Sequence, residues 1–157
     1  MKDASPAPCH RPCVLIVEDD DDVREFMQLL VSFAGYDTMT ARDGQDALVK
    51  MRQRRPCLVL LDLQMPRMDG WEFRARQMQD LSLSDIPVVC VTAFFDPAQV
   101  TRQLGLRCIS KPADFPSIID AVETTCGGAS RELKADSFPW FCGRICPRHS
   151  KGGRPFS

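Results

Sequence analysis

Three short apolar runs constrain the fold of this chain more than any other feature of its sequence. They occupy residues 13–17, 57–61 and 86–92 and are rich in valine, leucine and isoleucine. Apolar runs of this length, without polar alternation, predict strands that are covered on both faces. Weaker strand patterns at 36–41 and 108–110 complete the set of expected strands.

Stretches with helical spacing of apolar residues separate the predicted strands. Gly35 follows the first of them, in the position typical of a helix end. Asp96 and Pro97 have the pattern of an N-cap followed by proline at the first helical position. The pairs Asp43-Gly44 and Asp69-Gly70 are predicted as turns. The helices are expected at 23–34, 47–51, 71–78, 97–104 and 115–122, the last one ended by Gly127 and Gly128.

The order of these elements is a strand followed by a helix, five times over. Strands buried on both faces that alternate with helices imply a parallel sheet between two layers of helices, a three-layer α/β sandwich. Right-handed crossovers leave few topologies for such a sheet.

The charge of the chain is divided unevenly along its length. The formal net charge is −1, but residues 13–126 carry 12 basic and 18 acidic side chains, whereas residues 127–157 carry six basic and two acidic ones. An acidic body is a poor match for a nucleic-acid surface, where affinity comes mainly from neutralising phosphates. It is more typical of a protein that holds a cation.

The chain shows no pattern of export or membrane insertion. No apolar run approaches the roughly 18–20 residues needed to cross a bilayer, and the polar N-terminus lacks the apolar stretch of a secretory signal. We therefore expect a cytoplasmic protein without a membrane partner. Because disulfides are rare in that compartment, we expect most of the eight cysteines to be free thiols.

Polar residues follow the predicted strands at the points where those strands end. Ligands of doubly wound parallel sheets bind at the carboxyl ends of the strands, so these residues are expected to converge. Close carboxylates repel one another, and a hard divalent cation such as Mg²⁺ or Ca²⁺ removes that conflict. The residues are Glu18 and Asp19 after the first strand, Asp62 after the third, Thr92 at the end of the fourth and Lys111 after the fifth.

Each of these residues also has a purely structural interpretation. Acidic residues after a strand often cap a helix and favour its dipole, and this is the preferred interpretation of Asp20, Asp21 and Asp22. An isolated Thr92 or Lys111 would more often be an ordinary loop residue. The functional interpretation depends on the predicted topology bringing distant residues to one edge of the sheet.

Four sequence blocks resemble the receiver domain of bacterial two-component response regulators. The blocks are Val14-Leu-Ile-Val-Glu-Asp-Asp20, Leu60-Leu-Asp-Leu-Gln-Met-Pro-Arg-Met-Asp-Gly70, Val91-Thr-Ala93 and Ser110-Lys-Pro112. The resemblance covers roughly residues 12–126. With the element order, it predicts a doubly wound, flavodoxin-like sheet of five parallel strands in the order 2-1-3-4-5.

The resemblance also implies roles for the residues at the sheet edge. Asp62 would be the phosphoacceptor, forming an acyl phosphate, with Lys111 and Thr92 contacting the phosphoryl oxygens. Mg²⁺ would be bound by Asp19 and Asp62, by the backbone carbonyl of Gln64, and by Glu18 through water. The peptide bond between Lys111 and Pro112 is expected to be cis, as is typical of the family.

The chain departs from the family pattern at several positions. Cys108 stands where family members usually have Tyr or Phe, so it cannot act as the aromatic side chain that changes rotamer on activation. The segment between Thr92 and Lys111 is a few residues shorter than usual, which puts the usual signalling surface in doubt. Glu18 replaces the commoner Asp, and Phe94 is expected to slow dephosphorylation by hindering the hydrolytic water.

The ends of the chain differ from the predicted domain. We expect a disordered lead over residues 1–12, a receiver domain over 13–127 and a flexible basic tail with cysteines over 128–157. Phe138, Trp140 and Phe141 are candidates to anchor this tail to the body or to a partner. A zinc site is disfavoured because the spacing matches no familiar zinc pattern; it would combine Cys9, His10 and Cys13 with Cys142, Cys146 and His149.

The preferred hypothesis is a stand-alone phosphorylation switch. It would take phosphate from a histidine kinase or a phosphotransfer protein and signal to an unknown downstream protein, with no DNA-binding domain. It would catalyse its own phosphorylation and slow dephosphorylation without conventional turnover. The alternatives are a Mg²⁺-dependent phosphohydrolase with Asp62 as nucleophile, and a degenerate receiver that only binds partners. Phosphohydrolases resembling the haloacid dehalogenases commonly carry Asp-x-Asp, whereas this chain has Asp62-Leu-Gln64.

Overall fold

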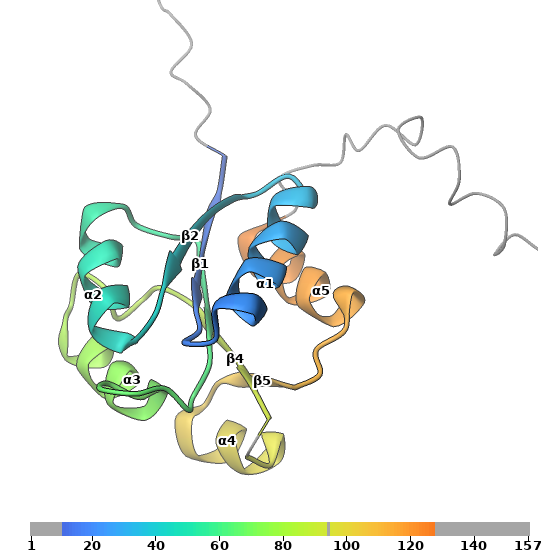
Figure 1. Ribbon diagram of the computed structural model, residues 1–157. Coiled ribbons are helices and arrows are strands. Elements are labelled where there is room, and N and C mark those ends of the chain that lie inside the picture. Colours follow the sequence, from blue (N-terminus) through green and yellow to red (C-terminus); the bar gives the residue numbers. More distant parts are fainter. Residues whose placement is uncertain (1–10, 94, 128–157) are drawn as a thin grey trace, which may run out of the picture.

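The computed structural model describes residues 11–93 and 95–127, and Figure 1 shows their arrangement. Strands and helices alternate along the described residues, as the sequence predicts. The predicted lead over residues 1–12 and the tail over 128–157 lie almost wholly outside the described residues. The elements are β1 (Cys13–Val17), α1 (Asp21–Phe33), β2 (Asp37–Ala41), α2 (Gly44–Gln53), β3 (Leu58–Leu61), α3 (Gly70–Gln79), β4 (Val88–Thr92), α4 (Pro97–Leu104), β5 (Arg107–Ser110) and α5 (Phe115–Cys126).

The five strands form one parallel sheet in the order β2-β1-β3-β4-β5. This is the predicted order, with β1 and β3 side by side in the middle of the sheet. The register pairs Val17 of β1 with Leu61 of β3, so the residues that follow these two strands begin at the same level. The topology therefore places the carboxyl ends of β1 and β3 next to each other at one edge of the sheet.

Two layers of helices cover the sheet, because side chains alternate between the two faces of a strand. Leu15 and Val17 of β1 face a core that contains Met51 of α2 and Phe73 of α3. Val14 and Ile16 face the other core, which is closed by residues of α1 and α5. Figure 1 shows α1 and α5 together on one side of the sheet. The three-layer sandwich is thus confirmed.

Aspartates cap the N-termini of the helices. The Asp20 carboxylate accepts hydrogen bonds of 3.0 Å from the backbone N–H groups of Asp22 and Val23, which confirms the capping interpretation of this acidic run. Asp96 caps α4 and is followed by Pro97, as expected. The pairs Asp43-Gly44 and Asp69-Gly70 do not form the predicted turns. In each pair, the aspartate caps a helix that begins at the glycine.

The prediction that most cysteines are free thiols does not hold for one pair. Cys57, just before β3, forms a disulfide with Cys126, the last residue of α5. The sequence could not show this, because the two residues are 69 positions apart and only the fold brings their Cα atoms to 5.6 Å, a separation a disulfide can span. Within the described part of the chain, Cys13, Cys90 and Cys108 are free, as expected.

Over residues 11–93 and 95–127, none of the helices has both the length and the apolar character required to span a membrane.

Candidate functional site

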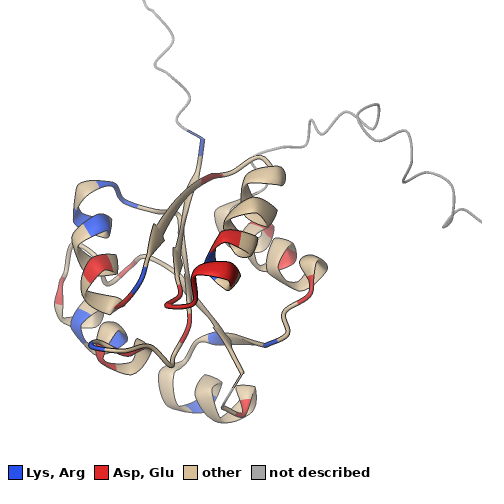
Figure 2. Cartoon of the chain, in the orientation of Figure 1, with Lys and Arg blue, Asp and Glu red and all other residues tan. Residues whose placement is uncertain are grey.

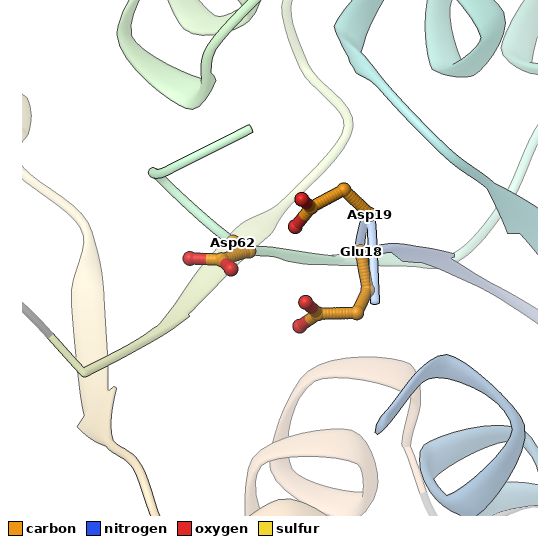
Figure 3. A group of neighbouring side chains, drawn as sticks. All are labelled: Glu18, Asp19 and Asp62. Atoms are coloured by element: carbon orange, nitrogen blue, oxygen red, sulfur yellow. The ribbon is translucent and has the colours of Figure 1, made fainter. Parts of the chain in front are cut away.

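Three carboxylates meet at the carboxyl edge of the sheet (Figure 3). Glu18 and Asp19 follow β1, and Asp62 follows β3; one oxygen from each lies within 4.8 Å of the others. Backbone hydrogen bonds extend the strand pairing into these residues: the Asp62 N–H donates to the Val17 carbonyl at 2.9 Å and the Glu18 N–H to the Ala41 carbonyl at 3.0 Å. The predicted convergence of these three residues is confirmed.

The ammonium of Lys111 lies beside two of these carboxylates. Its Nζ donates to Glu18 Oε2 at 2.6 Å and to Asp62 Oδ2 at 2.9 Å. The backbone N–H of Lys111 donates to the Thr92 carbonyl at 2.9 Å, which continues the pairing of β4 with β5. The peptide bond from Lys111 to Pro112 is cis, as the resemblance implied. One lysine therefore joins the fifth strand to the acidic group.

Burial makes this charge arrangement unusual. Glu18 is 2% exposed and Asp62 is 7% exposed, whereas Asp19 is exposed. Burial raises the pKa of Glu18 to about 7, against the lowering effect of Lys111 and with a further increase from the Asp62 charge. Burial opposes the charge of Lys111, but its hydrogen bonds to Glu18 and Asp62 outweigh this and raise its pKa. The site holds three carboxylates beside one lysine, so it has two more carboxylates than Lys111 can neutralise.

Thr92 ends β4 with its side chain fully buried. Among the described residues, its hydroxyl has no hydrogen-bond partner. An unpaired buried hydroxyl costs free energy, so buried hydroxyl groups nearly always have a hydrogen-bond partner. The position fits the predicted role of Thr92 as a donor to an anion bound at the sheet edge.

Three residues near the site have contacts that the sequence analysis did not anticipate. Arg24 Nη1 donates to the Glu18 carbonyl at 2.9 Å and so holds the loop between β1 and α1. Gly70 packs so tightly that a Cβ there would lie 2.7 Å from the Asp62 carbonyl oxygen. The Gln64 N–H donates to Asp62 Oδ1 at 3.2 Å and orients the carboxylate. Of these contacts, the sequence points only to the one at Gly70, through the pair Asp69-Gly70, which the sequence analysis interprets as a turn.

The donor set fits a hard divalent cation. All three clustered side chains are carboxylates, and oxygen ligands of this kind favour Mg²⁺ or Ca²⁺ over softer metals. The exposed Asp19 gives the group access to solvent. A divalent cation would also compensate the two carboxylates that Lys111 leaves unneutralised. The residues described here are therefore suited to the predicted metal.

Of the two departures from the family pattern at Cys108 and Phe94, only Cys108 lies among the described residues. Cys108 lies half-buried on β5, opposite Cys90 on β4, and packs against the core with α4 residues such as Leu104. Phe94, expected to slow dephosphorylation, lies outside the described residues, as do the candidate zinc ligands at Cys9, His10, Cys142, Cys146 and His149.

Comparison with known proteins agrees with this fold. The family model of the response regulator receiver domain matches residues 14–123. The chain therefore belongs to the receiver domains of two-component signalling.

One relative is the polar-differentiation response regulator DivK of Brucella anthropi, 37% identical over 120 residues, a match that covers 74% of this chain and 97% of the relative. The DivK protein of Brucella ovis is 36% identical over the same shares. The match thus spans nearly the whole length of both relatives.

Solved structures of receivers are similar over the same region. The chemotaxis protein CheY4 of Vibrio cholerae is 28% identical with a TM-score of 0.65, and the match covers 73% of this chain and 98% of CheY4. The receiver domain of a signal transduction histidine kinase from Syntrophus aciditrophicus is 29% identical with a TM-score of 0.67, over 78% of this chain and 96% of that domain. The flavodoxin-like receiver fold of this chain is thus shared with a chemotaxis protein and with a domain of a histidine kinase.

Proposed function

We propose that this receiver takes a phosphoryl group on Asp62 from the phosphohistidine of a histidine kinase or phosphotransfer protein. The observation that carries the proposal is the position of the Asp62 carboxylate, which is buried at the sheet edge between the Lys111 ammonium and the carboxylates of Glu18 and Asp19. A carboxylate used only as a helix cap needs neither neighbour.

The transfer is a displacement at phosphorus. A carboxylate oxygen of Asp62 forms a bond to the phosphorus atom, while the bond from phosphorus to the imidazole nitrogen of the donor breaks and its electron pair stays on that nitrogen. The product is an acyl phosphate on Asp62, and the donor leaves as a neutral histidine because its imidazole ring is protonated on the other nitrogen before the transfer. Catalysis of such a transfer depends mainly on positioning and on neutralising charge.

Three residues of this chain supply the positioning and the charge. The Gln64 N–H fixes one oxygen of Asp62 through its hydrogen bond of 3.2 Å. Lys111 Nζ donates a hydrogen bond to Asp62 Oδ2 at 2.9 Å, so its positive charge lies where the phosphoryl oxygens would be bound. The unpaired hydroxyl of Thr92 would donate to one of those oxygens, which would satisfy it.

The metal that fits this site is Mg²⁺. Glu18, Asp19 and Asp62 would hold it, together with the backbone carbonyl of Gln64, which we retain from the family resemblance. When bound, Mg²⁺ supplies positive charge that lowers the repulsion between the carboxylates and an incoming phosphoryl group. Lys111 contributes the same kind of charge from the protein itself.

We also propose the setting in which this switch works. The receiver domain would extend over 13–127, slightly beyond the family match. Its location would be the cytoplasm, where histidine kinases hold their phosphohistidine, and its output would be binding to a downstream protein. The half-buried Cys108 supports an output that does not use an aromatic side chain at this position.

Phosphorylation by a small donor tests the proposal. The purified chain is incubated with acetyl phosphate and Mg²⁺, and its intact mass is measured. We expect the gain of one phosphoryl group, which is absent in Asp62→Ala and retained in Asp22→Ala, a matched change at an exposed carboxylate. No gain in the parent, or an equal gain in Asp62→Ala, would overturn the proposal. Sustained turnover of generic phosphate esters would instead indicate a phosphohydrolase.

A further inference from the structure

A solvent-open cavity lies at the amino end of the sheet, at the opposite edge from Asp62. Its volume is about 600 Å³, within the range of small-molecule sites. It forms where the chain enters β1 and where it passes from α2 to β3. Arg11, Arg54 and Arg55 line it, and none of the described residues in its lining is acidic. Figure 2 shows basic residues on both of these segments.

The charge of this cavity is positive even when its ion pairs are counted. Arg54 Nη2 donates to Asp37 Oδ2 at 2.7 Å, and Arg55 pairs with Asp85. Both pairs are exposed to solvent, where ion pairs hold their partners only weakly. The guanidinium of Arg11 adds a third positive charge against these two carboxylates. The lining therefore favours an anionic ligand, above all one with carboxylates.

One half of the disulfide forms part of the cavity wall. Cys57 lines the cavity, whereas neither its partner Cys126 nor any other described residue of α5 does. The Cys57 N–H donates to the Cys13 carbonyl at 2.8 Å, which holds this wall against the start of β1. Cys57 is only partly buried. A molecule in the cavity thus reaches Cys57 from the side of β1 and α2, away from α5.

This side is the one from which a disulfide sulfur is attacked. Exchange is a displacement by a thiolate, which approaches opposite to the sulfur that leaves, here that of Cys126. The other thiol of the cavity, Cys13, is 4% exposed, and burial raises its pKa, so it stays protonated and unreactive. The attacking thiolate must therefore come from solution.

We propose that the cavity binds a small thiol that carries carboxylates, and that this thiol exchanges with the disulfide at Cys57. Its thiolate sulfur forms a bond to Cys57 Sγ. The bond between the two protein sulfurs breaks, and its electron pair stays on Cys126, which takes a proton from water. The product is a mixed disulfide at Cys57 and a free thiol at Cys126, so the end of α5 is released from β3.

A second small thiol completes the reduction. Its sulfur forms a bond to the sulfur of the first thiol, and the electron pair of the mixed disulfide stays on Cys57, which is then protonated. Two small thiols are oxidised to their disulfide while the protein disulfide is reduced to two thiols. No other oxidant or reductant takes part.

The surroundings of Cys126 disfavour an attack at the other sulfur. Glu123 lies one turn before Cys126 on the same side of α5 and is exposed. Its carboxylate repels a thiol that is itself anionic. The first adduct is therefore expected at Cys57.

Two forms of one thiol test the proposal. The full-length protein, purified without reductant, is treated at low salt with glutathione or with its monoethyl ester, in which one carboxylate is blocked. The reaction is stopped with N-ethylmaleimide, intact mass follows the loss of the disulfide, and peptide mass spectrometry locates the first adduct. We expect glutathione to react about tenfold faster than the ester, and the advantage to shrink at high salt.

The double variant Arg54→Gln, Arg55→Gln removes two charges from the cavity. It should slow the reaction with glutathione by about tenfold and leave the reaction with the ester nearly unchanged. The control is Arg52→Gln, at an arginine near the end of α2 that also pairs with a carboxylate but does not line the cavity. It should behave as the parent does, and circular dichroism checks that each variant is folded.

Several outcomes would overturn the proposal. They are equal rates for glutathione and the ester in the parent, a first adduct at Cys126, and a purified protein that lacks the disulfide. A double variant that slows equally with both thiols would also overturn it, because the arginines would then support the fold around the disulfide rather than bind a carboxylate.

Discussion

The Glu18 carboxylate is buried at the sheet edge, and burial raises its pKa from an ordinary value of 4.5 to about 7. The folded protein therefore binds a proton here more tightly than the unfolded chain does. The free energy of unfolding contributed by this residue is highest below pH 4.5 and falls as the pH rises to about 7. Above pH 7, the buried charge of Glu18 lowers the free energy of unfolding by roughly 3 kcal/mol relative to its value below pH 4.5.

Glu18→Gln is expected to remove this cost in the absence of metal. With a chelator present, urea unfolding should show the variant to be more stable than the parent at pH 8, and the difference should vanish near pH 4. With Mg²⁺ at pH 8, the parent should gain more stability than the variant because the metal needs the carboxylate. A difference in stability that does not change with pH would contradict this account of Glu18.

Thr92 offers a test in which stability and activity separate. Thr92→Val keeps the shape of the side chain and removes a buried hydroxyl that has no partner among the described residues. We expect the free energy of unfolding of Thr92→Val to equal that of the parent or to exceed it by about 1 kcal/mol. Phosphorylation by acetyl phosphate should slow by roughly tenfold or more. Thr92→Ser keeps the hydroxyl and should retain most of the rate. A strongly destabilised Thr92→Val would indicate a structural role instead.

At the scale of the elements, the start of α3 positions the end of β3. An added Cβ at Gly70 would lie 2.7 Å from the Asp62 carbonyl oxygen and 2.8 Å from the Leu63 Cα, both backbone atoms. Gly70→Ala should therefore destabilise the protein by about 1–3 kcal/mol and slow phosphorylation.

Gly44→Ala is the matched comparison for Gly70→Ala, because Gly44 also begins a helix. There the two nearest atoms, at 2.7 and 2.8 Å, belong to the flexible side chain of Met68, which can shift more readily than backbone, and only the Phe73 Cβ at 2.9 Å is held by its backbone. Urea unfolding of both variants should show the smaller loss for Gly44→Ala. Equal losses, together with an unchanged phosphorylation rate in Gly70→Ala, would mean that the close packing against Asp62 is not important.

The Cys57–Cys126 disulfide connects β3 to the end of α5 across 69 positions of sequence. Closing a loop of this length restricts the unfolded chain and stabilises the protein by about 4 kcal/mol in the chain-entropy model. Reductant should lower the urea midpoint of the parent by a corresponding amount. It should have no effect on Cys126→Ser, which lacks the bond from the start; equal sensitivity of both proteins would contradict the disulfide.

For the molecule as a whole, the sequence was sufficient to predict the sheet order and the convergence of Glu18, Asp62 and Lys111. The convergence follows from local patterns, since a buried apolar run gives a strand and the residue after it reaches the sheet edge, whereas the sheet order came from the resemblance to receiver domains. The disulfide and the packing of Gly70 were not predictable in this way. Both depend on distances between segments far apart in the chain, which no local pattern encodes. Asp69-Gly70 shows the difficulty: the same pair is typical of a turn and of a capped helix.

The central claim is that Asp62 carries the phosphoryl group, and locating that group tests it most directly. After reaction with acetyl phosphate and Mg²⁺, borohydride reduces an acyl phosphate on aspartate to homoserine, which peptide mass spectrometry locates in the sequence. We predict homoserine at position 62, and at neither Asp19 nor Asp69. Homoserine at another aspartate, or none in a protein that has gained phosphate, would contradict the account.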